Sequence, residues 1–390
     1  RLEFAERHFL LIAAARTALQ GAVHDALTDQ LRQALGRPSN SSESPMPSVA
    51  PRAADPLGES CRAWLLELAL AGFKNLGHEA IAPFDSTLEH LITDSTRIRA
   101  AALLLGFQRE LLHALPMSAL PAIPAARWAD LWARGFLITL DSQNAHSNAP
   151  DGQRVSGRLA PIGIDLRQHG LFASAVAYAV LERDGQPDQV IRTSCSSYKV
   201  DAVRGAEVWN CFESRFLALA EALVQGQSVE VANGLLLPDG DLMLGDVSAS
   251  GAASDPFETA ARALAPGQGT AIATPGVAAL DRHPVQIAEP VSLTGYEVRE
   301  SPSEDASSRI ELVDPDGGSI AVDPARLAAS SPMGLGPAEI LGSKELIGLV
   351  RRDADRWSVQ VLAVRAGDRK RTTVFVGPPT TAPGKKGGKK

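Results

Sequence analysis

The chain has 390 residues, of which 45% are hydrophobic and 21% charged, a composition typical of a globular protein with two or three domains and a real core. The formal net charge of −7 argues against a nucleic-acid-binding protein, because such proteins usually present a basic field to phosphates. A run of 18 apolar residues, as a membrane span needs, is absent, and three cysteines are too few for a disulfide framework and indicate a cytoplasmic location.

The first 140 residues are predicted to be helical. Helical candidates cover residues 2–35, 57–76, 85–115 and 125–140, and a linker rich in serine and proline covers residues 37–56. In the first of these helices the apolar residues are predicted to lie near one stripe, which contains Phe4, Phe9, Ile12, Leu19, Val23, Leu27 and Leu31.

The middle of the chain is predicted to be a small sheet with a helix packed on it. Two β-rich runs, residues 172–181 and 189–200, flank an Asp-Gly turn and therefore predict a hairpin. An apolar run at 158–166 precedes them. Over residues 207–225 the apolar spacing changes to three and four, which predicts a helix.

From residue 267 onward the sequence is typical of short strands separated by turns. The clearest pair is formed by residues 346–351 and 357–365, and a third strand at 371–376 completes a meander. Short strands at this spacing favour a small barrel or a sandwich. The remaining strand candidates are residues 270–274, 285–288, 295–298, 308–313 and 319–322.

The predicted fold class is α+β, with a helical N-terminal layer, a mixed α/β middle and a β-rich C-terminal module. Because the chain starts at Arg1 instead of methionine, we expect the natural protein to be longer. The predicted divisions are an N-terminal helix at 1–36, a flexible linker at 37–56, a helical domain at 57–140, a mixed domain at 156–265, a β-rich module at 267–377 and a disordered lysine-rich tail at 378–390.

One hypothesis places an enzyme site on the middle sheet, at Cys195, Tyr198, Lys199 and Asp201. The letters of Ser196–Lys199 match the S-x-x-K motif of acyl-transfer enzymes. That motif needs its serine at a helix N-terminus, whereas residues three apart on a strand point to opposite faces. A solvated, polar end of a strand is therefore the favoured interpretation.

Metal-ligating residues are sparse. A zinc site formed by His169, Cys195 and Cys211 would match no established ligand spacing, and cysteine is often buried as a small apolar residue. Asp239 and Asp241 match the start of a calcium loop but not its remainder, which favours a tight turn. The sequence thus predicts neither a metal nor a cofactor.

The sequence offers candidate binding sites for two kinds of macromolecule, a protein partner and a nucleic acid. Trp128 and Trp132 are candidate anchors for a protein partner, because tryptophan is enriched at interfaces, although a helix-packing core is the favoured interpretation. Nucleic acid would have to bind the β-rich module and the lysines of residues 385–390. The module has few aromatic residues on which bases would stack, so this partner is the less favoured one.

Two segments carry a resemblance. Residues 125–137 (AARWADLWARGFL) and 157–166 (GRLAPIGIDL) resemble bacterial accessory proteins from gene clusters of MoxR-type AAA ATPases, von Willebrand A-domain proteins and SWIM zinc-finger proteins. The chain has neither the cysteines of the zinc finger nor an ATPase loop, so the resemblance transfers no catalytic residue. It implies an accessory component, and we accordingly predict a non-catalytic adaptor or scaffold whose partners are other proteins.

Overall fold

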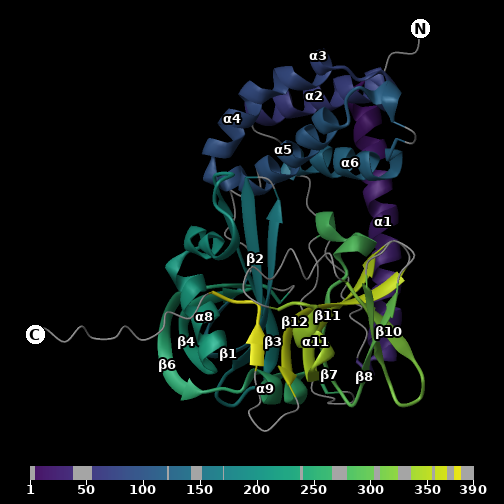
Figure 1. Ribbon diagram of the computed structural model, residues 1–390. Helices are drawn as coiled ribbons and strands as arrows, with labels where there is room; N and C mark the ends of the chain where they lie inside the picture. The colour runs from purple at the N-terminus through teal and green to yellow at the C-terminus, as the bar shows by residue number, and fades with distance from the viewer. Residues whose placement is uncertain are drawn as a thin grey trace, which may run out of the picture. The chain divides into compact units, whose positions relative to one another are not determined.

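A computed structural model gives the fold of the chain (Figure 1). Helices come first and strands follow in two sheets, so the predicted α+β class is confirmed. Contacts group the chain into a helical unit, drawn from residues 1–28, 41–151 and 277–284, and a β unit, drawn from residues 29–40, 152–276 and 285–390. The structure describes residues 5–37, 55–120, 123–141, 152–169, 171–237, 240–265, 279–302, 308–323, 335–353, 356–366 and 373–378.

The helices of the helical unit follow the predicted ranges with two interruptions. A helix expected at 57–76 ends at Ala71, because Gly72 adopts a φ of 73°. A single helix expected at 85–115 is broken where Asp94 leaves helical geometry and accepts a hydrogen bond from the Thr96 backbone. The elements are α1 (Glu6–Ala34), α2 (Pro56–Ala71), α3 (His78–Ile81), α4 (Asp85–Thr93), α5 (Ile98–His113) and α6 (Ala125–Asp141).

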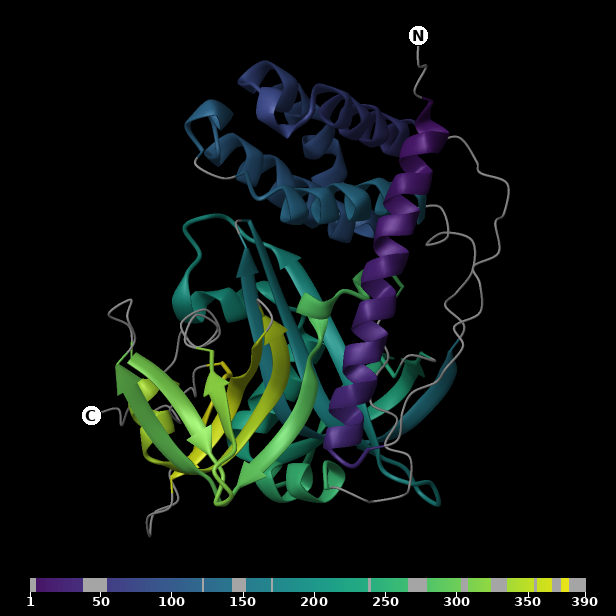
Figure 2. The ribbon, with the colours of Figure 1, turned by 90° about the vertical axis from the view of Figure 1, so that its right-hand side faces the viewer.

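Figure 2 shows α1 as one unbroken helix over its 29 residues. Among the described helices none is both long and apolar enough to cross a membrane.

The first sheet of the β unit contains the predicted hairpin. Its strands β2 and β3 pair antiparallel with Val180 opposite Val190, which confirms the prediction. The strand order is β3-β2-β1-β4-β5, and β6 also pairs with β4. The strands are β1 (Gln153–His169), β2 (Phe172–Glu182), β3 (Gln189–Tyr198), β4 (Gln227–Leu236), β5 (Leu242–Met243) and β6 (Asp246–Ala253).

This sheet curls until its two edges meet. Arg192 on β3 bridges to Asp241, and its Nε donates to the Asp241 carboxylate at 2.6 Å. The buried face is covered by α8 (Ser214–Gln225), which ends at Gly226 in the left-handed region. The predicted helix at 207–225 therefore starts later than expected, because the 3₁₀ segment Gly205–Cys211 precedes α8.

The second sheet has the strand order β7-β11-β12-β10-β9-β8, and β13 pairs with β12. The expected pair of 346–351 with 357–365 is confirmed as β11 and β12. The prediction of a strand at 285–288 is wrong, because the 3₁₀ segment Pro284–Gln286 occupies its start. The strand predicted at 270–274 lies outside the described residues. The strands are β7 (Glu289–Thr294), β8 (Glu297–Pro302), β9 (Ser308–Val313), β10 (Ser319–Val322), β11 (Ser343–Asp353), β12 (Arg356–Ala366) and β13 (Thr373–Phe375).

The two sheets share a hydrophobic core. Ile162 and Val180 of the first sheet pack in one buried cluster with Leu349 and Leu362 of the second. The helix α9 (Pro256–Ala263) contributes Phe257 to the same cluster, and the short helix α11 (Pro337–Leu341) precedes β11. The predicted domain boundary at residue 267 stays a prediction.

Candidate functional site

The four predicted enzyme residues lie on β3 and the loop after it. Lys199 follows the last residue of the strand; its side chain is buried and its Nζ donates to the Val203 carbonyl at 3.3 Å. Burial raises the pKa of the Cys195 thiol, which lowers the thiolate fraction that a nucleophile needs. Within the described part of the chain no hydrogen bond joins Cys195, Tyr198, Lys199 or Asp201 to another of the four. An enzyme site at this position stays a prediction.

The described residues contain no group of three His, Cys, Asp or Glu side chains that could hold a metal ion. Cys195 lies on β3 and Cys211 ends a 3₁₀ segment, whereas the side chain of His169 lies outside the described residues. Asp241 pairs with Arg192. Asp239 and the lysines of 385–390 lie outside the described residues.

Trp128 and Trp132 are core residues. Only 1% of Trp128 and 6% of Trp132 is exposed. Each indole N–H has a partner inside the helical unit: Trp128 donates to the Glu110 carboxylate and Trp132 to the Leu65 carbonyl, both at 2.9 Å. The hypothesis that these residues anchor a partner is wrong, because helix packing covers both rings, and the helix-packing interpretation is confirmed.

The inner face of α1 is fixed within the helical unit. Phe9 packs edge-to-face on Trp132 with ring centroids 6.3 Å apart. The Arg16 guanidinium donates to the Asp130 carboxylate at 2.5 Å and to the Ala126 carbonyl at 3.0 Å. These contacts join α1 to α6 and determine which side of α1 faces the other helices.

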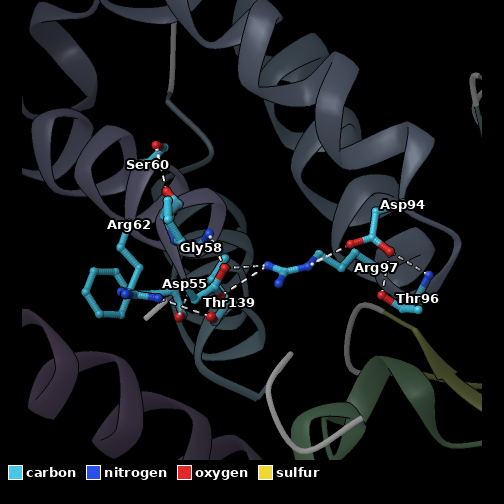
Figure 3. Close-up of polar contacts among 10 residues, drawn as sticks. Asp55, Gly58, Ser60, Arg62, Asp94, Thr96, Arg97 and Thr139 are labelled. Atoms are coloured by element: carbon cyan, nitrogen blue, oxygen red, sulfur yellow. Dashed lines mark hydrogen bonds and ion pairs between the residues drawn. The ribbon is translucent and has the colours of Figure 1, made fainter. Parts of the chain in front are cut away.

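The first turn of α1 is joined by one ion pair to α2, beside a cluster of charged residues. Arg97 lies between two carboxylates, with Nη1 at 3.0 and 3.1 Å from the Asp55 oxygens and Nε at 3.1 Å from Asp94 (Figure 3). Asp55 also caps α2 by accepting a hydrogen bond from the third residue of the helix. In the same cluster Arg62 of α2 donates to Glu6 of α1 at 2.9 Å. The charge-assisted hydrogen bond between Arg62 and Glu6 thereby joins the start of α1 to α2.

The opposite side of α1 is apolar and exposed. We call it the outer face. It consists of every residue between positions 11 and 23 that is exposed: Leu11, Ile12, Ala14, Ala15, Ala18, Leu19, Ala22 and Val23. The exposed fractions of Leu11 and Leu19 are 67% and 65%. A surface helix normally turns charged or polar side chains to water, so an outer face without any is unusual.

Exposed large hydrophobic side chains are concentrated on this helix. Leu11, Ile12, Leu19 and Val23 are all exposed there, whereas the others among the described residues, such as Leu70 on α2 and Met243 on β5, are scattered over different elements. Single exposed apolar residues are ordinary, but a contiguous apolar patch marks an interaction site. The outer face is therefore the candidate functional site.

The apolar stripe predicted on this helix is buried only in part. Phe9 lies on the buried inner face, whereas Ile12, Leu19 and Val23 lie on the outer face. The sequence nevertheless indicates two apolar faces. Apart from histidine, Arg16 is the only acidic or basic residue between Arg7 and Asp25. A helix with so few charges is expected to be covered on more than one side.

No protein-family model matches the chain, and a comparison with curated proteins likewise gave no match.

Proposed function

We propose that the protein is a non-catalytic adaptor or scaffold that binds a protein partner through the outer face of α1. The observation that carries the proposal is the absence of polar side chains among the exposed residues from Leu11 to Val23, on a helix whose inner face is anchored. Burying a fully exposed leucine, isoleucine or valine contributes about 1.5–3 kcal/mol. Four partly exposed side chains of this kind supply a substantial share of the roughly 8 kcal/mol of a micromolar complex.

The partner class is proposed from the resemblance. Residues 125–137 and 157–166 resemble accessory proteins of clusters that encode MoxR-type AAA ATPases and von Willebrand A-domain proteins. An ATPase or an A-domain protein of a bacterial multi-protein system is accordingly the proposed partner, and the outer face is where an apolar helix or groove of that partner would dock.

The test is affinity purification of the tagged full chain from the cells that naturally make it, followed by mass spectrometry. The test variant is Leu19→Glu, which places a charge at the centre of the outer face. The matched control is Leu70→Glu, because Leu70 is 56% exposed and belongs to a different helix, α2. Unchanged circular dichroism and thermal midpoint for both variants show that the fold is intact.

The expected result is recovery of an ATPase or A-domain protein in stoichiometric amount with the wild type and with Leu70→Glu, and at least a tenfold lower recovery with Leu19→Glu. Equal recovery with all three chains would place the binding surface elsewhere. Recovery of the chain without any partner in every case would remove the adaptor function.

A further inference from the structure

We infer that the outer face of α1 packs against the outer face of a second copy of this chain, with the two helices antiparallel. The inference rests on the proposed function, because it takes the outer face as a protein-binding surface. It adds a second copy as an occupant that excludes the ATPase or A-domain partner from this face while the pair is intact. A symmetric pair of this kind is self-complementary. If residue i of one copy contacts residue j of the other, residue j of the first copy also contacts residue i of the second.

The spacing of the outer face is that of a helix–helix seam. Its residues recur three and four positions apart along α1, which keeps them on one side of a helix with 3.6 residues per turn. They span 12 residue steps, or about 18 Å along the axis at 1.5 Å per residue. The seam is thus long enough for more than three turns of continuous contact.

The order of large and small side chains favours an antiparallel pair. When the two-fold axis lies level with residue 17, residue n of one copy lies level with residue 34 − n of the other. Ile12 then meets Ala22 of the second copy and Leu19 meets Ala15, so these two large side chains each fill the space beside a small one, whereas Leu11 meets Val23. In a parallel pair in register, each residue would meet its own copy, which sets Leu19 against Leu19 and Ala15 against Ala15.

The charges at the two ends of α1 favour the same arrangement. Arg7 is exposed near the start of the helix, and Asp25 and Asp29 are exposed near its end. In the antiparallel pair Arg7 lies level with residue 27 of the second copy, midway between the two aspartates and about 3 Å from each along the axis. Asp25 also contacts His24 at 2.9 Å and Arg282 at 3.3 Å within its own chain, and about half of its side chain remains exposed. A parallel pair would bring like charges together at both ends.

The first experiment is light scattering coupled to size-exclusion chromatography, with the full-length chain at about 50 µM. The mass of one chain is 41.1 kDa, and we expect light scattering to give twice this molar mass for the wild type and for Leu70→Glu. The Leu19→Glu variant is expected to elute as a monomer, with a dimer dissociation constant raised at least tenfold. A wild type that stays monomeric, or a dimer that Leu19→Glu leaves intact, would overturn the inference.

A second experiment tests the direction of the pair. In the antiparallel arrangement Leu11 of one copy lies level with Val23 of the other, so the double variant Leu11→Cys/Val23→Cys should form covalent dimers on mild oxidation. Within one chain these positions are about 18 Å apart along the helix, which excludes a bond between them. The single variant Leu11→Cys should give no more cross-linked product than the wild type, and efficient cross-linking of that variant would show a parallel pair and overturn the antiparallel arrangement.

The failure of this inference is separable from failure of the proposed function. If the wild type is a monomer but Leu19→Glu still loses its partner in the affinity purification, the outer face binds a different protein and the adaptor function stands. If the chain is monomeric and the purification shows no dependence on Leu19, both proposals fail.

Discussion

Asp165 and Arg351 form an ion pair of 2.7 Å in which the exposed fractions of the two side chains are 1% and 0%. Asp165 lies on β1 and Arg351 on β11, so the pair links the two sheets of the β unit. Gln360 of β12 donates to the other oxygen of the Asp165 carboxylate at 2.7 Å. Arg167, which lies on β1 like Asp165, donates to the same oxygen as Arg351. The carboxylate therefore accepts three hydrogen bonds at the contact between the sheets.

We predict that Asp165→Ala lowers the free energy of unfolding of the β unit by about 3–5 kcal/mol, because it leaves the Arg351 charge buried without its carboxylate. The measurement is urea denaturation followed by far-ultraviolet circular dichroism. The control is Arg299→Ala, which removes an exposed ion pair with Glu297 and should change the stability little. Similar effects of the two substitutions would contradict a structural role of the buried pair.

The same carboxylate predicts a dependence of stability on pH. Burial alone would raise the pKa of Asp165, but Arg167, Arg351 and the hydrogen bond from Gln360 outweigh it and hold the pKa below its usual range. A carboxyl whose pKa is lowered by folding stabilises the protein above its unfolded pKa, and this contribution is lost as pH falls through the folded pKa.

The free energy of unfolding should therefore fall below about pH 4, where an unfolded aspartate begins to bind protons. The decline should be shallower in Asp165→Asn, which has no carboxyl to titrate at this position. The measurement is a series of urea denaturations between pH 7 and pH 2.5 for both chains. Parallel curves for the wild type and the variant would show that Asp165 does not contribute to the acid sensitivity.

Cys61 is predicted to be unreactive in the folded protein. Burial, together with the nearby carboxylate of Asp55, raises the pKa of this thiol to about 12, so the reactive thiolate is scarce at pH 8. The side chain has no exposed surface. Iodoacetamide should label Cys61 only when urea unfolds the helical unit, and peptide mass spectrometry measures this. Labelling of native Cys61 as fast as the less buried Cys211 would contradict the prediction.

Local signals predicted those parts of the fold that depend on neighbouring residues. The hairpin of β2 and β3 was predictable because its strand pattern and its turn at Gly185 lie within one segment of the sequence. The break at Asp94 was missed because a side chain that caps its own backbone competes with helix geometry at a single residue.

The candidate site depended on contacts between distant residues. Which side of α1 is buried follows from Arg16 and Asp130, which are 114 positions apart, and no period within the helix encodes that choice. The Asp165–Arg351 pair spans 186 positions and is equally invisible in a local pattern. Sequence periodicity thus finds the helix, but only the packed structure separates its inner face from its outer face.

The approach of the two sheets at Gly163 gives a further prediction. A Cβ atom at this position would lie 2.8 Å from Cδ1 and 3.1 Å from Cβ of Leu362, and the β1–β2 register shifts between Pro161 and Gly163. Gly163→Ala is therefore expected to lower the free energy of unfolding by about 1–3 kcal/mol, as overpacking of a core does. Gly342→Ala is the control, because the nearest atom to a Cβ there is 3.8 Å away.

Leu362→Ala provides the decisive comparison for this contact. On its own it should destabilise the protein by about 2–5 kcal/mol, because it removes a buried leucine side chain from the core between the sheets. In the double variant Gly163→Ala/Leu362→Ala the new methyl group occupies part of the space that the leucine vacates. The combined loss in urea denaturation should consequently be smaller than the sum of the two single losses by at least 0.5 kcal/mol. Strict additivity would show that Gly163 is required for the backbone bulge of β1 and not for the approach of Leu362.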